Sequence, residues 1–245
     1  MSRPLQDKEL SLMEHFVELR KRLMVAFIAL VVTTGFCMVF AEKGLQLIIR
    51  PMGDTIPQTI QVTESFVVYF RVAFIGGLAL SMPIIVFELV RFLLPGLLPS
   101  ERKYLYFLIP GVFFCFILGM AFAAFVMLPA AINFMQGFLT TVVENRWTLD
   151  NYVSFVTRVM FWMGIVFQMP LILFFLGKLG LVTPKSLAKF RKWAILLTAV
   201  IAAMVTPTPD PINMMIVMVP LYLLYEVGVL LTRFARVKKP ETVQP

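Results

Sequence analysis

The 245-residue chain has very few of the side chains that enzymes use for catalysis. It contains one histidine, His15, and two cysteines, Cys37 and Cys115, which lie in separate apolar stretches without CxxC or metal-ligand spacing. Walker A, GxGxxG and HExxH patterns do not occur. These shortages argue against a Ser–His protease and a histidine-rich metalloenzyme. We therefore expect no enzymatic activity, no catalytic residues, no metal site and no cofactor.

Long polar stretches are also lacking, since 60% of the residues are hydrophobic and the mean hydropathy is +0.87. The apolar runs do not alternate with polar residues as a water-facing helix does. They are also continuous rather than of period two, which argues against a β-barrel. The sequence predicts an all-α integral membrane protein with a single domain, residues 1–245, and six transmembrane helices. The expected segments are a cytoplasmic head at 1–22 and spans at 23–40, 72–94, 104–128, 159–176, 193–205 and 212–231.

Positive charge is concentrated in segments that these spans place on one face of the membrane. Of the 22 lysines and arginines, 17 fall there, and the remaining ones are Lys43, Arg50, Arg71, Arg146 and Arg158. Positive residues near span ends resist translocation, so this face is cytoplasmic and so are both termini. The same bias accounts for the net charge of +8, and no nucleic-acid partner is expected.

Two segments outside the spans also carry helical patterns. The head, residues 1–22, has an apolar stripe at helical spacing, which predicts a helix lying on the membrane surface before it turns into the first span. The outer segment 41–71 is moderately apolar and is interrupted by proline and glycine. It predicts a cap of short helices over the outer end of a concave bundle.

The second half of the chain has two unusual spans. Pro170 removes a backbone hydrogen bond and predicts a kink near Gln168. An amide in hydrocarbon needs partners, so Gln168 marks either an interhelical hydrogen bond or a water-filled recess, and the residues alone do not decide between them. The fifth span, Trp193–Val205, has only 13 uncharged residues, about 20 Å of helix against a hydrocarbon core of roughly 30 Å. The final hairpin is therefore expected to be short, or the bilayer to thin beside it.

Acidic residues near the cytoplasmic face are the main candidates for binding. If the head folds beside the first inner loop, Glu18 and Glu101 form an acidic spot that suits a guanidinium ligand. Alternatively, Glu18 only pairs with Arg22 one helical turn away. The residues alone leave both interpretations open. Structural pairs, with Arg91 and Arg233, are the expectation for Glu88 and Glu226.

Five motifs occur in a fixed order along nearly the whole chain. They are HFVELRKRL at His15–Leu23, FLLPGLLPSERK at Phe92–Lys103, FQMP at Phe167–Pro170, TPTPD at Thr206–Asp210 and PLYLLYEVG at Pro220–Gly228. Together they resemble the TatC family, the core subunit of the twin-arginine protein translocase. The resemblance implies a signal-peptide receptor that helps to export folded proteins across the bacterial inner membrane, using the proton-motive force.

The resemblance also implies roles for individual residues. Signal-peptide binding falls to Glu18, Glu101, Arg20, Arg22, Phe92 and Pro95, and partner docking or structural roles fall to Thr206, Asp210, Pro51 and Glu226. Many family members have a glutamate where this chain has Gln168, which cannot titrate; with this resemblance we predict the water-filled recess at Gln168. The implied partners are TatA- and TatB-like single-span proteins, twin-arginine signal peptides of folded cargo, membrane lipid and further copies of the chain. The alternative function is secondary transport of a small solute.

Overall fold

The structure is a computed structural model, and it describes residues 12–53, 57–93, 102–137, 147–206 and 210–235. Nearly all of these residues are helical, which confirms the all-α prediction. The elements are α1 (Leu12–Met38), α2 (Ala41–Ile49), the 3-10 turn η1 (Arg50–Met52), α3 (Glu64–Leu93), α4 (Arg102–Phe122), the π-helical η3 (Ala123–Met127), α5 (Leu128–Gly137), α6 (Leu149–Val166), α7 (Met169–Lys178), α8 (Pro184–Val205) and α9 (Pro211–Phe234).

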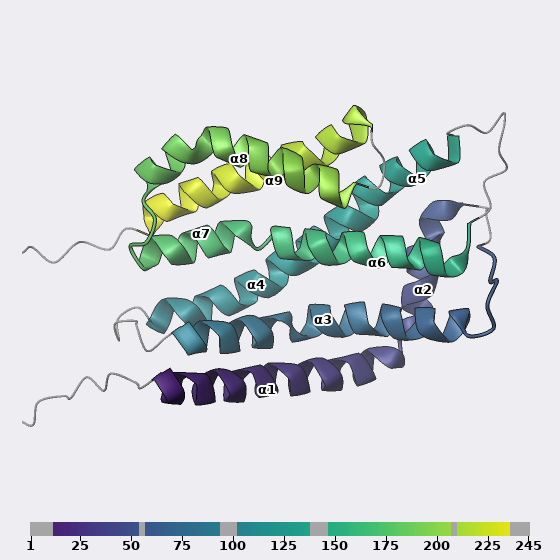
Figure 1. Cartoon of the computed structure of the whole chain (residues 1–245), viewed down its shortest axis with the longest axis horizontal. Helices are drawn as coiled ribbons and strands as arrows, with labels where there is room; N and C mark the ends of the chain where they lie inside the picture. Colours follow the sequence, from purple (N-terminus) through teal and green to yellow (C-terminus); the bar gives the residue numbers. More distant parts are fainter. Residues whose placement is uncertain (1–11, 54–56, 94–101, 138–146, 207–209, 236–245) are drawn as a thin grey trace, which may run out of the picture.

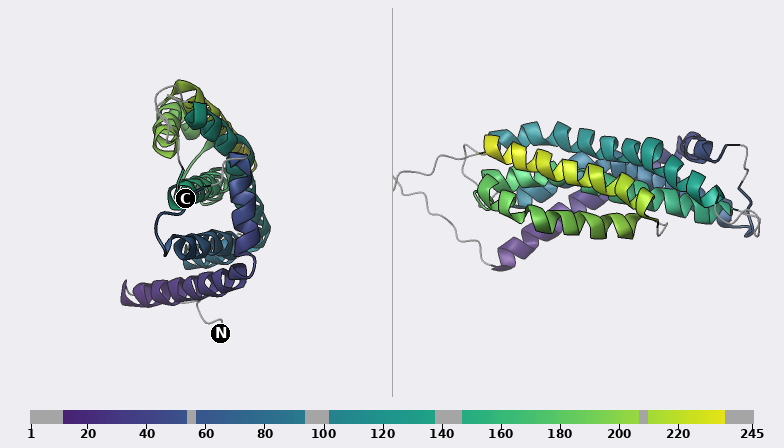
Figure 2. Two further views of the ribbon diagram at one scale, coloured as in Figure 1. Left: turned by 90° about the vertical axis from the view of Figure 1, so that its right-hand side faces the viewer. Right: turned by 90° about the horizontal axis from the view of Figure 1, so that it is seen from above.

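The long helices run side by side along the long axis of the molecule (Figure 1). Viewed end-on they follow an arc, with α1 at one end of the arc and the α8–α9 pair at the other (Figure 2). Within the described ranges, five segments are long and apolar enough to span a membrane: His15–Met38, Glu64–Phe92, Ile109–Gly137, Leu149–Lys178 and Pro211–Phe234. The chain is thus a multi-pass membrane protein, while the count of six spans stays a prediction that depends on α8.

The first helix differs from its prediction. α1 runs without interruption from Leu12 to Met38 and passes straight through the expected boundary after residue 22. The predicted turn between a surface helix and the first span is therefore wrong. The physical reason is local: no proline or glycine occurs between Leu12 and Gly35, and the charged residues of this stretch are good helix formers.

Close packing of small residues holds α1 against α3. A side chain added at Gly77 would meet the backbone of Thr34, and one added at Gly76 would meet Cys37. The Thr33 hydroxyl donates a hydrogen bond of 2.8 Å to the Gly77 carbonyl oxygen. Small residues allow helices to approach closely in a membrane, where no hydrophobic force drives them together. This contact fixes the register of the two helices on which the candidate site lies.

The end of the bundle far from the start of α1 and the end of α9 is capped by the short helix α2 and the turn η1, and the sequence predicts such a cap (Figure 2). Beyond the cap, the loop before α3 pairs with the segment before α6. Gln58 N donates to Trp147 O and Leu149 N donates to Gln58 O, both at 2.9 Å. The largest group of buried apolar side chains lies at this end and in the middle of the bundle, and it includes Met52, Val68, Ile132, Tyr152 and Met163.

The fourth expected span is broken where the sequence predicts a kink. α6 ends at Val166 and α7 begins at Met169, with a turn at Phe167 and Gln168 between them. The following helix, α8, has 22 residues and is about 33 Å long, so it extends well beyond its 13-residue apolar run. The extra turns are the basic N-terminal half of α8, which begins with a capping box of Thr183 and Ser186.

Candidate functional site

Polar side chains meet where the N-terminal end of α1 lies against the C-terminal end of α3. The Arg22 guanidinium lies between two carboxylates: its Nη1 donates to Glu88 Oε2 at 3.1 Å, and its Nη2 donates to Glu18 Oε1 at 3.3 Å. Glu18 and Arg22 are one turn apart on α1, whereas Glu88 comes from α3. One helix thus supplies an acid and a base, and the other supplies a second acid.

We call the contact of Glu18, Arg22 and Glu88 between α1 and α3 the seam. An aromatic contact extends the seam toward the end of the two helices. The rings of His15 and Phe92 are stacked, with centroids 4.3 Å apart. His15 and Arg22 are seven residues apart and Glu88 and Phe92 are four apart, so each pair lies on one face of its helix. Because α1 and α3 run in opposite directions, the two faces meet with His15 beside Phe92 and Arg22 beside Glu88.

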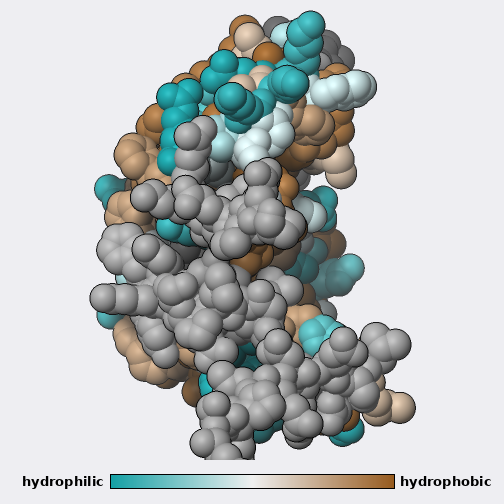
Figure 3. Space-filling model, turned by 90° about the vertical axis from the view of Figure 1, so that its left-hand side faces the viewer, coloured by the Kyte–Doolittle hydropathy of each residue, from teal (hydrophilic) through white to brown (hydrophobic). Residues whose placement is uncertain are grey.

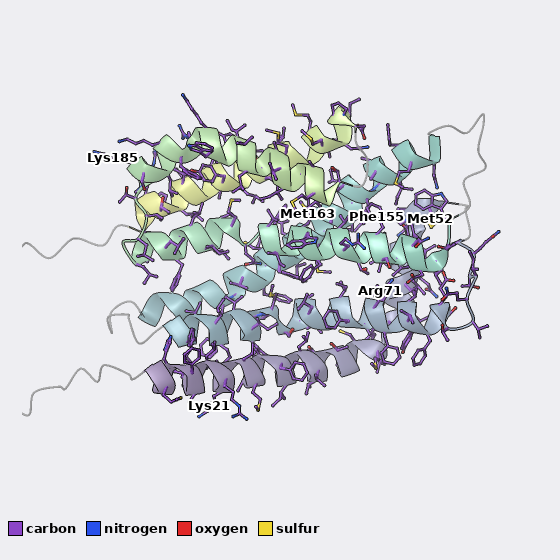
Figure 4. All side chains as sticks on the ribbon, in the orientation of Figure 1. Lys21, Met52, Arg71, Phe155, Met163 and Lys185 are labelled. Carbon is purple, nitrogen blue, oxygen red and sulfur yellow. The ribbon has the colours of Figure 1, made fainter. Side chains whose placement is uncertain are left out.

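Exposure differs among the three charged groups of the seam. The side chain of Glu88 is 9% exposed, that of Arg22 18% and that of Glu18 25%. Glu88 therefore lies deepest and Glu18 is the most accessible acid. The basic neighbours Arg20 and Lys21 are exposed, and Lys21 points away from the bundle (Figure 4). Two carboxylates share one guanidinium, which leaves the seam itself with an excess of negative charge.

Two of the expected acid–base pairs are different in the structure. Glu88 pairs with Arg22, whereas Arg91 lies over the Phe87 ring with its guanidinium carbon 5.8 Å from the centroid. Glu226 pairs with Arg191 of α8 at 2.7 Å rather than with Arg233. The Tyr222 hydroxyl also donates to Glu226, at 2.9 Å. The ion pair of each acid is therefore formed with a neighbouring helix.

Two of the predicted binding residues, Pro95 and Glu101, lie outside the described residues. Of the others, Glu18, Arg22 and Phe92 are brought together in the seam, and Arg20 lies exposed beside them. The local Glu18–Arg22 pair that competed with the acidic spot is present. It leaves the Glu18 carboxylate partly exposed, so the pair and an acidic spot are compatible.

Gln168 lies between helices in the middle of the bundle. Its side chain is buried, and Nε2 donates to the Val112 carbonyl oxygen of α4 at 3.0 Å. No residue in the described part of the chain donates to its Oε1 atom. The contact favours an interhelical hydrogen bond over the water-filled recess that we predicted here.

The predicted outer residues have structural contacts. Thr206 is buried and its hydroxyl donates to Ala202 O at 2.7 Å. Asp210 caps α9 by accepting hydrogen bonds from Asn213 N at 2.9 Å and Asn213 Nδ2 at 2.6 Å. Pro51 is the second residue of η1 and lines an apolar pocket beside α5 and α6.

Sequence reasoning missed a group of polar contacts between α3 and α6 at the capped end of the bundle. Arg71 of α3 donates to Asp150 Oδ1 at 2.6 Å and to the Ser154 hydroxyl, and it points from α3 toward α6 (Figure 4). Glu64 accepts backbone hydrogen bonds from Asp150 N at 2.6 Å and from Ile60 N at 2.8 Å. The signal in the sequence is a charged residue next to an apolar run, as Arg71 is, and this does not identify the residue with which it pairs.

A basic surface lies at the N-terminal end of α8. Lys185, Lys189 and Lys192 are exposed there, and hydrophilic side chains gather over this part of the molecule (Figure 3). Among the described residues, no group of three His, Cys, Asp or Glu side chains could hold a metal ion. The exposed lysines at this end can bind negatively charged groups.

Comparisons with known proteins agree on one family. The model of the family described as Sec-independent protein translocase protein (TatC) matches residues 14–220. The chain is similar to TatC of Carboxydothermus hydrogenoformans, with 32% identity over 96% of this chain and 98% of that one. It is similar to TatCy of Bacillus subtilis, with 36% identity over 93% and 90%. A crystal structure of the twin-arginine translocase receptor TatC has a TM-score of 0.75 and 32% identity, and it covers 91% of this chain and 99% of that one.

Proposed function

Because the chain belongs to the TatC family of Sec-independent protein translocase proteins, we propose that it receives twin-arginine signal peptides at the cytoplasmic ends of α1 and α3. It then serves as the core component that exports the folded cargo across the inner membrane, driven by the proton-motive force. Both of its termini lie in the cytoplasm. Transport of a small solute, the alternative that the sequence left open, has no support among these relatives.

The contact between Arg22 and Glu18 is the observation that carries this site. It is an arginine–carboxylate pair at a partly exposed position, so the Glu18 carboxylate is placed to bind a guanidinium. Charge-assisted hydrogen bonds of this kind are about twice as strong as neutral ones, and carboxylates can accept two from one guanidinium. A signal peptide with two adjacent arginines supplies two such groups. We propose that the carboxylates of Glu18 and Glu101 bind the two arginines, with Arg20, Phe92 and Pro95 beside them.

Photo-crosslinking of a peptide tests this site. The peptide carries two adjacent arginines and a photoreactive residue next to them, and the purified full-length protein is the target. We expect Glu18→Ala and Glu101→Ala each to weaken crosslinking, and a peptide with two lysines to crosslink poorly to the wild-type protein, since an ammonium lacks the planar fork of a guanidinium. Glu101→Asp should also weaken it, because the shorter side chain misplaces the carboxylate. Normal crosslinking in both alanine variants would eliminate this site.

The exposed face of α8 is the proposed docking surface for TatA- and TatB-like single-span proteins. It carries large apolar side chains at helical spacing, namely Trp193, Leu196, Leu197, Val200 and Met204. Thr206 itself is buried, so its part in docking is to end the helix in the right conformation rather than to contact the partner. A cysteine in place of Met204 should form a disulfide with a cysteine in the span of such a partner, and one in place of buried Ala202 should not. Further copies of the chain complete the translocase.

A further inference from the structure

The two acids that hold Arg22 have different positions in the fold. We infer that Glu88 is a positioning residue of the signal-peptide site: it retains Arg22 when an arginine of the signal peptide takes the Glu18 carboxylate. The inference rests on the proposed function, and it adds a residue that none of the motifs includes. It also gives Arg22 a specific role, as the protein's own occupant of the receptor carboxylate before a peptide arrives.

Arg22 has the same chemical group as the proposed ligand. In the structure its Nη2 donates to Glu18 Oε1, so a guanidinium already lies where a signal-peptide arginine is to bind. An incoming arginine must therefore replace Arg22 on Glu18. A guanidinium that loses a carboxylate in a half-buried position pays a large desolvation penalty unless another acceptor holds it.

Glu88 is placed to be that acceptor. Its Oε2 accepts from Arg22 Nη1 at 3.1 Å, through a different nitrogen from the one that binds Glu18. The Arg22–Glu88 bond can therefore persist while the Arg22–Glu18 bond, at 3.3 Å, is exchanged. The burial of the groups agrees with this order, because Glu88 is the deepest of the three and Glu18 the most exposed. A peptide arginine that approaches from the cytoplasm reaches Glu18 first.

The charge balance of the seam also favours a second guanidinium. Two carboxylates face one guanidinium at the contact. Among the other described cations of these helix ends, Arg20 and Lys21 are exposed, and Arg91 lies over the Phe87 ring. A peptide arginine on Glu18 completes two separate ion pairs, one with Glu18 and one between Arg22 and Glu88. Removal of the Glu88 charge leaves both guanidinium groups competing for Glu18.

Binding of a fluorescent twin-arginine peptide to the full-length protein in lipid nanodiscs tests the inference. In Glu88→Gln, Arg22 can turn both terminal nitrogens to Glu18, and we expect the dissociation constant to rise roughly tenfold, the effect of one charge-assisted hydrogen bond. In the double variant Arg22→Met with Glu88→Gln, nothing competes for Glu18, and affinity should return to at least the wild-type value. Methionine keeps the apolar stem of Arg22, so helix packing is preserved.

Three comparisons make the outcome decisive. Glu88→Asp keeps the charge and should bind more tightly than Glu88→Gln, while Glu42→Gln, the same change on an exposed acid of α2, should bind as the wild type does. Wild-type affinity in Glu88→Gln would overturn the inference. So would a double variant as weak as Glu88→Gln, because Glu88 would then act on the peptide directly or through the fold. Glu18→Ala separates this question from the site itself: normal binding there refutes the proposed site, whatever Glu88 does.

Discussion

A methyl group added at Gly77 should separate α1 from α3 and weaken peptide binding at the proposed signal-peptide site, which is distant from Gly77. The Cβ atom of an alanine there would lie 2.6 Å from both the N and Cα atoms of Thr34, where ordinary contacts begin at 3.4 Å. The helices would have to move apart by about 0.8 Å, since both sides of this contact are backbone. The hydrogen bond from Thr33 to Gly77 O would lengthen or break.

The same displacement reaches the seam if α1 moves as a rigid rod. The Arg22–Glu88 distance of 3.1 Å would then grow to about 3.9 Å, beyond hydrogen-bonding range. Overpacking of this kind costs about 1–3 kcal/mol, and each kcal/mol lowers the melting temperature of a chain of this size by about 2–4 °C. We therefore expect Gly77→Ala to lower both the melting temperature of the purified protein and the affinity for a twin-arginine peptide.

Gly35→Ala is the matched control for this prediction. Gly35 is one residue beyond Thr34 on α1, and an added Cβ atom there meets nothing within 4 Å. Alanine also favours the helix by up to about 1 kcal/mol over glycine. The control should melt at or above the wild-type temperature and bind peptide normally. Equal melting temperatures for Gly77→Ala and Gly35→Ala would show that the α1–α3 contact is not as tight as described.

Three further predictions concern the rest of the molecule. Arg71→Met should lower the free energy of unfolding by up to about 1 kcal/mol, because it removes the partly exposed pair with Asp150, and it should make the loops at that end easier to cleave by protease. Arg158→Met, which removes an exposed arginine, should have neither effect. A cysteine in place of Gln168 should not react with membrane-impermeant thiol reagents from either side, because that side chain is buried. Labelling of this cysteine would instead support the water-filled recess. Reporter fusions at Gly53 should report outside and at Lys185 inside; an outside signal at Lys185 would contradict six spans.

The sequence predicts the helices of this fold well because each apolar run is a local property. It predicts their interruptions less well. Pro170 accompanies a break between α6 and α7, whereas Pro83, Pro110 and Pro220 lie inside continuous helices. A proline removes one backbone bond in every case, but neighbouring helices decide whether the chain bends there. The prediction of a separate head helix at residues 1–22 is wrong for a different reason. The amphipathic pattern is present there, but the sequence contains no residue that ends the helix before the first span.

In the candidate site, too, local contacts could be predicted from the sequence and contacts between helices could not. The Glu18–Arg22 pair follows from a spacing of four residues on one helix. The Arg22–Glu88 pair joins residues 66 apart, and the Arg71–Asp150 pair joins residues 79 apart. Such pairs depend on the register of two helices, which here is set by contacts such as that of Gly77 with Thr34. That register is a three-dimensional property, so the sequence could identify the charged residues but not their partners.

The composition of α8 has a consequence for how the chain enters the membrane. The first half of α8 is basic and its apolar half is short. It is not one of the five segments that are long and apolar enough to span a membrane. It is instead bound to α9, through the Arg191–Glu226 pair at 2.7 Å and the hydrogen bond from the Tyr225 hydroxyl to Leu187 O at 2.7 Å. During synthesis α8 leaves the ribosome before α9. We therefore expect α8 to enter the bilayer together with α9, as a hairpin, rather than before it.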